Sequence, residues 1–148
     1  MRHRTAWSLL FAAALAVIAG CEATEKADSK PTSRSRVHYL EIVCRDVSAQ
    51  CTALERIYGL SFGPPVADLG QARVAEAADG TLIGVRAPMA EHEQPVQRTY
   101  VEVADIERAI KDAEAAGCEV AYPPTRQGDT GTWAIYFLGE VQFGLWQR

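Results

Sequence analysis

The sequence predicts an α+β fold made of two copies of one βαβββ module, and two observations indicate it. Residues 37–148 contain an internal repeat, because a shift of 59 positions places Asp46 on Asp105 and the Pro64-Pro65 pair on Pro123-Pro124. Each half also shows the same order of patterns, namely an alternating strand, an amphipathic helix and three further strands.

The first module is expected over residues 37–86. It begins with VHYLEIVC, whose alternation predicts a strand. Asp46 or Ser48 can cap a helix over residues 48–58, and Gly59 ends that helix. LSF predicts a short strand before a Gly-Pro-Pro break, and the ARVAEA and TLIGVRA segments around an Asp-Gly pair predict a hairpin.

The second module, residues 98–148, follows a linker over residues 87–97 and repeats these elements. TYVEV predicts a strand, Asp105 caps a helix over residues 106–116, and Gly117 ends it. CEVAY precedes the second proline pair, and TWAIYF and VQFGLW predict a second hairpin.

The start of the chain predicts an export signal over residues 1–20. Arg2 and Arg4 precede the apolar run AWSLLFAAALAVIAG, which is short for a membrane span, and Cys21 follows it. This ending resembles the lipobox of bacterial lipoproteins, which implies lipidation at Cys21 and an exported protein anchored at a bacterial membrane, in the periplasm or on the outer surface. After Cys21, residues 22–36 contain no large apolar side chain and predict a disordered tether.

Charge and cysteine spacing exclude two classes of function. Without residues 1–20, which hold two arginines and no acidic residue, the formal charge is 13 − 19 = −6. An acidic chain without a basic cluster argues against nucleic-acid binding. The spacing of Cys44, Cys51 and Cys118 is not that of a paired-cysteine zinc site. A Cys44–Cys51 disulfide and two packed thiols both stay open.

Strand alternation predicts a cleft on the sheet face that points away from the helices. Leu40, Ile42 and Cys44 are apolar on the first strand, as are Val101 and Val103 on the fifth, so these should pack on the helices. The opposite positions carry aromatic and charged side chains, which suit a polar-aromatic cleft better than a second core. They are Tyr39, Glu41, Val43, Arg98, Tyr100 and Glu102.

Four stretches stand in an order typical of one known group of proteins: YLEIVCRDV, the GLSFGPP turn, VEVADIERAI with AEAAGCEV, and the closing GLWQ. Together with the tandem duplication they resemble the vicinal oxygen chelate superfamily, which includes glyoxalase I, extradiol dioxygenases and bleomycin-resistance proteins. The resemblance covers about residues 37–147, the whole of the part expected to fold, and implies curved mixed sheets that enclose a cleft.

The metal enzymes of that superfamily bind a divalent ion with one His, Gln or Glu on each of four strands. Carried over, these positions fall on Tyr39, Val85, Arg98 and Gly144. Valine and glycine have no ligating group and arginine repels a cation, so no metal and no cofactor are expected. A one-residue slip would substitute His38 for Tyr39, but it would also turn two apolar residues into the cleft.

The resemblance then implies a metal-free binding protein, whose cleft encloses a small amphipathic or aromatic molecule and which commonly works as a homodimer. Gly144 is expected to leave room for ligand beside Trp146. The expected ligand-binding residues are Tyr39, Glu41, Val85, Arg98, Tyr100, Glu102, Gln142, Gly144 and Trp146.

Several readings of the cleft stay open. Arg98 can anchor a carboxylate or phosphate, or it can form an internal salt bridge with Glu41 or Glu102. The alternative function is an enzyme, a lyase, hydroxylase or dioxygenase, which uses a divalent metal held by other residues or Glu41 or Glu102 as an acid or base. A structural lipoprotein is a third alternative. His92 in the linker is expected to be solvated.

Overall fold

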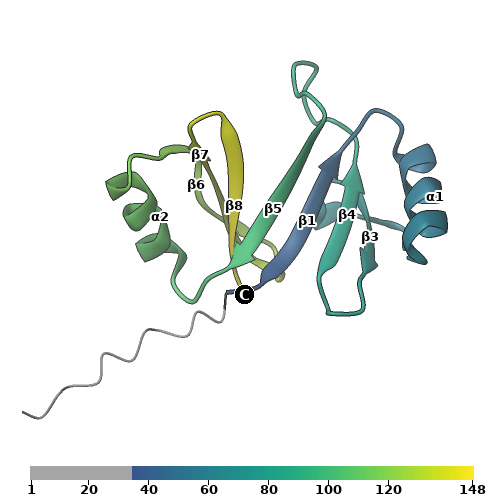
Figure 1. Cartoon of the computed structure of the whole chain (residues 1–148), viewed down its shortest axis with the longest axis horizontal. Helices are drawn as coiled ribbons and strands as arrows, with labels where there is room; N and C mark the ends of the chain where they lie inside the picture. The colour runs from purple at the N-terminus through teal and green to yellow at the C-terminus, as the bar shows by residue number, and fades with distance from the viewer. Residues whose placement is uncertain (1–34) are drawn as a thin grey trace, which may run out of the picture. The chain divides into compact units, whose positions relative to one another are not determined.

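A computed structural model describes residues 35–148, which form one compact unit. The tandem βαβββ order predicted from the sequence is confirmed (Figure 1). The elements are β1 (Val37–Val43), α1 (Val47–Tyr58), β2 (Pro65–Val66), the 3₁₀ helix η1 (Ala67–Leu69), β3 (Ala72–Glu76), β4 (Leu82–Arg86), β5 (Val96–Glu102), α2 (Ile106–Ala115), β6 (Glu119–Gln127), β7 (Gly131–Leu138) and β8 (Val141–Gln147). The predicted signal segment, Cys21 and the tether up to residue 34 lie outside the described residues.

All eight strands form a single mixed sheet in the order β2-β3-β4-β1-β5-β8-β7-β6. The two modules meet where β1 and β5 pair antiparallel at its centre, with Glu41 opposite Arg98 and Tyr39 opposite Tyr100. Within each module the first strand pairs parallel to the last, β1 with β4 and β5 with β8. The site is therefore built from strands that are far apart in the sequence and adjacent in space.

Both helices begin at the aspartates that the repeat places in register. The Asp46 carboxylate accepts a hydrogen bond from the Ala49 amide at 2.9 Å, and Asp105 accepts one from the Arg108 amide at 3.0 Å. Each satisfies an amide that would otherwise lack a partner in the first helical turn. Gly59 ends α1 in the left-handed conformation that glycine adopts without strain.

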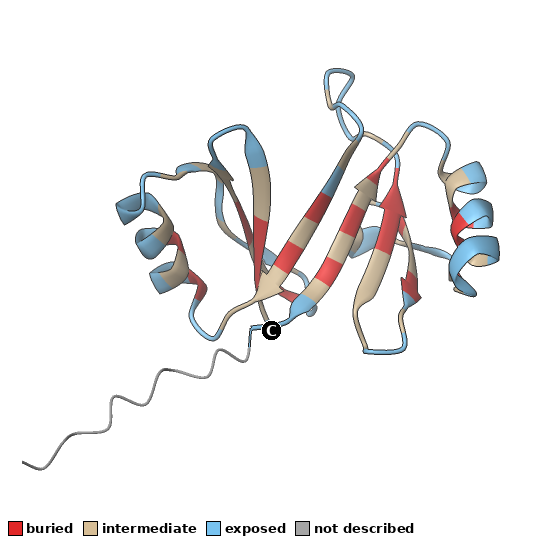
Figure 2. Ribbon diagram, in the orientation of Figure 1, coloured by how far each residue is buried: buried red, intermediate tan, exposed pale blue. Residues whose placement is uncertain are grey.

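Two clusters of apolar side chains lie on the helix side of the sheet, one for each module. Figure 2 shows buried positions in red on both helices and on the strands between them. Cys51 and Leu54 of α1 pack on Ala75 and Val85, while Ile106 and Ile110 of α2 pack on β7 and β8. Ile42, Cys44 and Val103 pack on these clusters, as the alternation predicted. Cys44 and Cys51 lie in one cluster as free thiols. Of the two alternatives left open by the sequence, the structure therefore has the packed thiols and not the disulfide.

Three segments differ in the structure from the ranges expected from the sequence. LSF is not a strand, because the Phe62 amide donates to Glu55 and the Phe62 carbonyl accepts from Arg73, so side chains take the place of a neighbouring strand. β5 begins inside the predicted linker, because Val96 pairs with Val43 of β1. Arg36 belongs to the domain and not to the tether, since its carbonyl accepts from the Glu102 amide at 2.8 Å.

Two glycines of the central sheet leave room for aromatic rings of the neighbouring strands. A methyl group on Gly144 would overlap the ring of Tyr100, and one on Gly84 would overlap the ring of Tyr39. Gly144 therefore accommodates a side chain of the protein itself, whereas the sequence predicted that a ligand uses this space. In both modules an aromatic ring of the first strand lies on a glycine of the parallel strand beside it.

Gly144→Ala is expected to lower the free energy of unfolding by about 1–3 kcal/mol, because the added methyl group forces the Tyr100 ring out of its packed position. Gly63→Ala is the matched control, since its methyl group would meet only the Val74 carbonyl oxygen at 3.6 Å. Urea denaturation of both variants measures the difference, and equal stabilities would contradict this packing account.

Candidate ligand pocket

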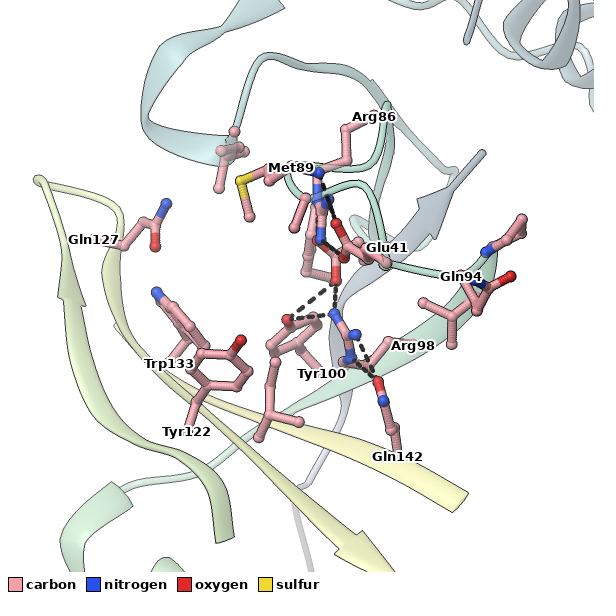
Figure 3. A pocket seen from close by; sticks show the side chains of 18 of the residues that line it. Glu41, Arg86, Met89, Gln94, Arg98, Tyr100, Tyr122, Gln127, Trp133 and Gln142 are labelled. Atoms are coloured by element: carbon pink, nitrogen blue, oxygen red, sulfur yellow. Dashed lines mark hydrogen bonds and ion pairs between the residues drawn. The ribbon is translucent and has the colours of Figure 1, made fainter. Parts of the chain in front are cut away.

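A cavity of about 600 Å³ lies on the sheet face that points away from the helices. Its walls come from both modules and from the segment between β4 and β5 (Figure 3). The lining residues are Tyr39, Glu41, Leu69, Gly70, Arg86, Met89, Ala90, His92, Glu93, Gln94, Pro95, Val96, Arg98, Tyr100, Tyr122, Gln127, Trp133, Ile135, Gln142 and Trp146. This volume is in the range that encloses a small organic molecule.

The Glu41 carboxylate lies between two guanidinium groups at one wall of the cavity. Its Oε1 accepts a hydrogen bond from Arg86 Nε at 2.6 Å, and its Oε2 accepts one from Arg98 Nη1. The Tyr100 hydroxyl donates to the same Oε2 at 3.2 Å. All three charged side chains are at least nine-tenths buried, so each depends on the others for the contacts that water would supply.

Arg98 is fixed in this position from the second module. Its Nε and Nη2 both donate to the Gln142 side-chain oxygen, at 2.9 and 2.6 Å. Glu41 and Arg98 lie opposite each other on β1 and β5 and form a salt bridge. This is the internal salt bridge that the sequence offered as one of two predicted roles for Arg98. Figure 3 shows these side chains joined in one continuous network.

Arg86 has a second carboxylate partner, Glu93, from the segment that connects β4 and β5. Arg86 Nη1 and Nη2 donate to the two oxygens of Glu93 at 2.9 and 2.7 Å. Burial opposes the charge of Arg86, but the Glu93 and Glu41 carboxylates outweigh it and raise the Arg86 pKa above its ordinary value. The Arg86 hydrogen bonds in turn lower the pKa of Glu93.

The remaining wall of the cavity is mainly aromatic. Tyr39, Tyr100, Ile135 and Trp146 form a buried cluster, on which Leu69, Leu82, Ala121 and Trp133 pack. Tyr122 and Trp133 lie with ring centroids 5.7 Å apart, across the open space from Glu41 and Arg86 in Figure 3. The cavity thus has a charged, hydrogen-bonded side and a flat apolar side.

Two buried polar atoms of this wall have no hydrogen-bond partner within the described residues. They are the Tyr39 hydroxyl oxygen and the Trp133 indole nitrogen. Burial and the nearby Glu41 carboxylate raise the pKa of Tyr39 far above its usual value, so its hydroxyl stays protonated. Neither atom is exposed to the open space of the cavity.

The structure brings most of the predicted ligand-binding residues to the cavity. Six of them line it, and whether they bind a ligand stays a prediction: Tyr39, Glu41, Arg98, Tyr100, Gln142 and Trp146. Val85 does not line it, because it pairs with Ile42 and packs in the core beneath α1. Val85 was predicted because the metal-ligand position of the superfamily's fourth strand falls on it. In the structure the neighbouring residue of β4, Arg86, lines the cavity instead.

Glu102 is also absent from the lining, because it lies at the end of β5 in a separate group of charges. It binds Arg36 at 2.8 Å and Arg148 at 2.7 Å. His38 lies beside this group, with its Nδ1 3.9 Å from Glu102 Oε2 and its ring centroid 5.1 Å from that of Trp146. Glu102 therefore connects the two ends of the domain and does not contact the cavity.

Sequence reasoning missed Arg86, Glu93 and the other lining residues between β4 and β5. Alternation could have found Arg86, because Ile83 and Val85 in TLIGVRA are apolar and mark the helix side. The segment after β4 carries no periodicity, so nothing in it indicated that it folds back over the cavity. His92, expected to be solvated, is exposed and also lies at the cavity wall.

The side chains at this position do not fit a divalent metal ion. The strands β1, β4, β5 and β8 supply Glu41, Arg86, Arg98 and Gln142. Two of these four are cations, and both bind Glu41, the one carboxylate among the four. Residues 35–148 also contain no group of three or more His, Cys, Asp and Glu side chains arranged for a metal. In the same range, no helix is long and apolar enough to cross a membrane.

Solved structures share this fold, although no protein-family model and no curated protein matches the chain. A hypothetical protein from Bacillus halodurans C-125 has a TM-score of 0.63 at 12% identity, covering 78% of this chain and 96% of that chain. Methylmalonyl-CoA epimerase from Mycobacterium tuberculosis has a TM-score of 0.58 at 16% identity, covering 75% and 86%. The Streptomyces coelicolor epimerase with 2-nitronate-propionyl-CoA has 0.56 at 19%, covering 76% and 96%. The chain therefore has the vicinal oxygen chelate fold.

Glu41→Gln is expected to lower the free energy of unfolding by about 3 kcal/mol, because it removes the buried negative charge that faces Arg86 and Arg98. Asp112→Asn is the control, since Asp112 forms an exposed pair with Arg108 at 3.7 Å, and its loss should cost no more than about 0.5 kcal/mol. Denaturant titration of the two variants checks the difference, and similar losses would argue against a buried, mutually dependent cluster.

Stability is expected to fall as the pH is lowered from about 7.5 to about 5.5, because burial lowers the pKa of His38 below its ordinary value of 6.5 despite the nearby Glu102. The unfolded chain binds a proton at His38 below pH 6.5 and the folded chain resists it, so protonation favours unfolding. His38→Phe keeps a ring against Trp146 and should flatten the dependence in urea denaturation. An unchanged slope in this variant would exclude His38 as the cause.

Proposed function

We propose that this chain is a metal-free binding protein of the vicinal oxygen chelate fold, whose cavity encloses a small amphipathic or aromatic molecule. One observation carries this proposal. On the adjacent strands β4, β1, β5 and β8, the side chains that face the cavity bind one another around the Glu41 carboxylate. They therefore offer no set of ligands for a cation. The cavity beside this network remains large enough for a small molecule.

The arrangement of the cavity suits a ligand with two unlike sides. The charged side offers hydrogen bonds near Arg86 and Arg98, and the aromatic side offers Tyr122 and Trp133 for stacking. A flat molecule with a polar end complements both sides.

Binding explains the site better than catalysis does. Both oxygens of Glu41 accept hydrogen bonds from guanidinium groups, so a role as general base would break the contacts that hold the two buried arginines. Glu102 lies outside the cavity and cannot act on its contents. The epimerase activity of the solved relatives is not carried over to this chain, because identities of 16–19% support the fold alone.

The proposed setting is a bacterial membrane, to which the protein is attached through lipidation at Cys21. The support for this is the sequence AWSLLFAAALAVIAG followed by Cys21. The folded domain begins with Arg36 and β1, at the end of the tether predicted over residues 22–36. The homodimer that the family resemblance implies stays a prediction.

The proposal predicts that residues 35–148, purified without the leader, contain less than about 0.1 metal ion per chain and keep their melting temperature in EDTA, whereas a flat aromatic probe such as 2-naphthol raises it. Trp133 and Trp146 are the only tryptophans of this part and both line the cavity, so their fluorescence reports binding directly.

Two exposed tyrosines give matched variants for this experiment. Tyr122→Ala removes a ring from the cavity wall and should weaken 2-naphthol binding, while Tyr58→Ala on α1 should leave it unchanged. Stoichiometric Fe, Mn, Ni or Zn whose removal lowers the melting temperature would instead favour the metal-dependent enzyme. Equal effects of the two tyrosine variants would place the probe outside the cavity.

A further inference from the structure

The two carboxylates that bind Arg86 are held in very different ways. Glu41 projects from the central strand β1, is 6% exposed, and is also bound by Arg98 and Tyr100. Glu93 projects from the segment between β4 and β5, and its side chain is 21% exposed. Apart from Arg86, its bonded partner is the Met89 amide of the same segment, at 2.7 Å.

The segment that carries Glu93, residues 87–95, is the surface segment at the mouth of the cavity. Most of its residues are exposed, and Met89 is 71% exposed. In Figure 1 it forms the projecting loop between β4 and β5. Because few side chains pack on it, Glu93 can leave Arg86 at a much smaller cost in packing than Glu41 can.

The charges of the cluster determine what can replace Glu93. Arg86 and Arg98 carry two positive charges, and Glu41 and Glu93 carry two negative ones, so the sum is zero. If Glu93 moves into solvent, a charge of +1 remains beside the enclosed cavity, which is unfavourable unless an anion takes its place. A neutral ligand therefore leaves Glu93 where it is, and an anionic ligand can exchange with it.

The geometry at Arg86 also selects the type of anion. Glu93 binds with one oxygen on each terminal nitrogen of the guanidinium group, at 2.9 and 2.7 Å, which is the paired contact of a planar carboxylate. A ligand carboxylate in this position would have its apolar body directed at the same cavity that Met89, Tyr122 and Trp133 line. The Glu93 side chain thus stands where the polar end of such a ligand fits.

Resting on the proposed binding function, we propose that the ligand is a small aromatic or apolar carboxylic acid whose carboxylate binds Arg86 in exchange for that of Glu93. In the free protein Glu93 acts as an internal substitute for the ligand and keeps the buried guanidinium group paired. Binding releases Glu93 together with the 87–95 segment, so the ligand opens its own site.

The test compares two flat probes of the same shape, 2-naphthoate and 2-naphthamide, which differ in charge. Residues 35–148 are used, because they contain the whole sheet and all three apolar clusters. Glu93→Gln removes the competing charge. Glu91→Gln makes the same change two positions away, at an exposed residue outside the cavity lining.

Glu93→Gln should bind 2-naphthoate at least about tenfold more tightly than the unchanged protein, since the probe no longer competes with a charge-assisted bidentate pair. Its affinity for 2-naphthamide should change by less than about twofold, and Glu91→Gln should bind both probes as the unchanged protein does. In the unchanged protein, 2-naphthoate should speed hydrogen exchange at the Met89 amide, whose acceptor is Glu93, and 2-naphthamide should not.

Equal gains for both probes in Glu93→Gln, or a Met89 amide that stays protected when 2-naphthoate binds, would overturn the exchange of carboxylates. In either case binding of 2-naphthamide would still support the proposed function. If neither probe binds the unchanged protein or Glu93→Gln, the binding function fails together with this inference.

Discussion

The carboxylate of Glu41 is the contact on which the cavity depends, because it joins two buried cations that arrive from different parts of the chain. Arg86 comes from the last strand of the first module and Arg98 from the first strand of the second. Without a shared anion the two guanidinium groups would repel one another in a place with little water. The central pairing of β1 with β5 brings Glu41 opposite Arg98 and so makes this arrangement a consequence of the sheet register.

The repeat supplies a symmetric scaffold, and the cleft residues break its symmetry. A shift of 59 positions relates Tyr39 to Arg98 and Glu41 to Tyr100, and the antiparallel register places Glu41 opposite Arg98 and Tyr39 opposite Tyr100. Glu41 thus pairs with the repeat equivalent of Tyr39, and Tyr39 pairs with the repeat equivalent of Glu41. The Glu41–Arg98 pair is ionic and the Tyr39–Tyr100 pair is aromatic. Two pairs that the repeat relates to each other therefore form a charged side and an apolar side of one cavity.

Stability and function are closely coupled at this site. A network that fully satisfies its own charges stabilises the centre of the sheet, but it also occupies the groups that would bind a ligand. At Arg86, one of the two carboxylate partners is Glu93, which comes from the surface segment after β4 and not from a central strand. A partner supplied by a loop can be exchanged, whereas one supplied by a central strand cannot be removed without disturbing the sheet.

The sequence by itself determined the local and periodic features of this protein. The repeat, the helix cap at Asp105, and the division of β1 into a helix side and a cleft side all follow from residue type and spacing, while the choice of Asp46 over Ser48 as the first cap came from the structure. These features depend on neighbours within a few residues, where alternation and capping chemistry are reliable guides.

The tertiary structure alone decided which distant side chains meet. Arg86 reaches Glu41 across 45 positions, Tyr100 fills the space that Gly144 leaves, and Glu93 folds back onto Arg86. None of these contacts has a signature in the sequence, because each depends on strand register and on the reach of a long side chain. The elements of the fold were therefore predictable from the chain, while the contacts of Arg86 with Glu41 and Glu93 were decided by the tertiary structure alone.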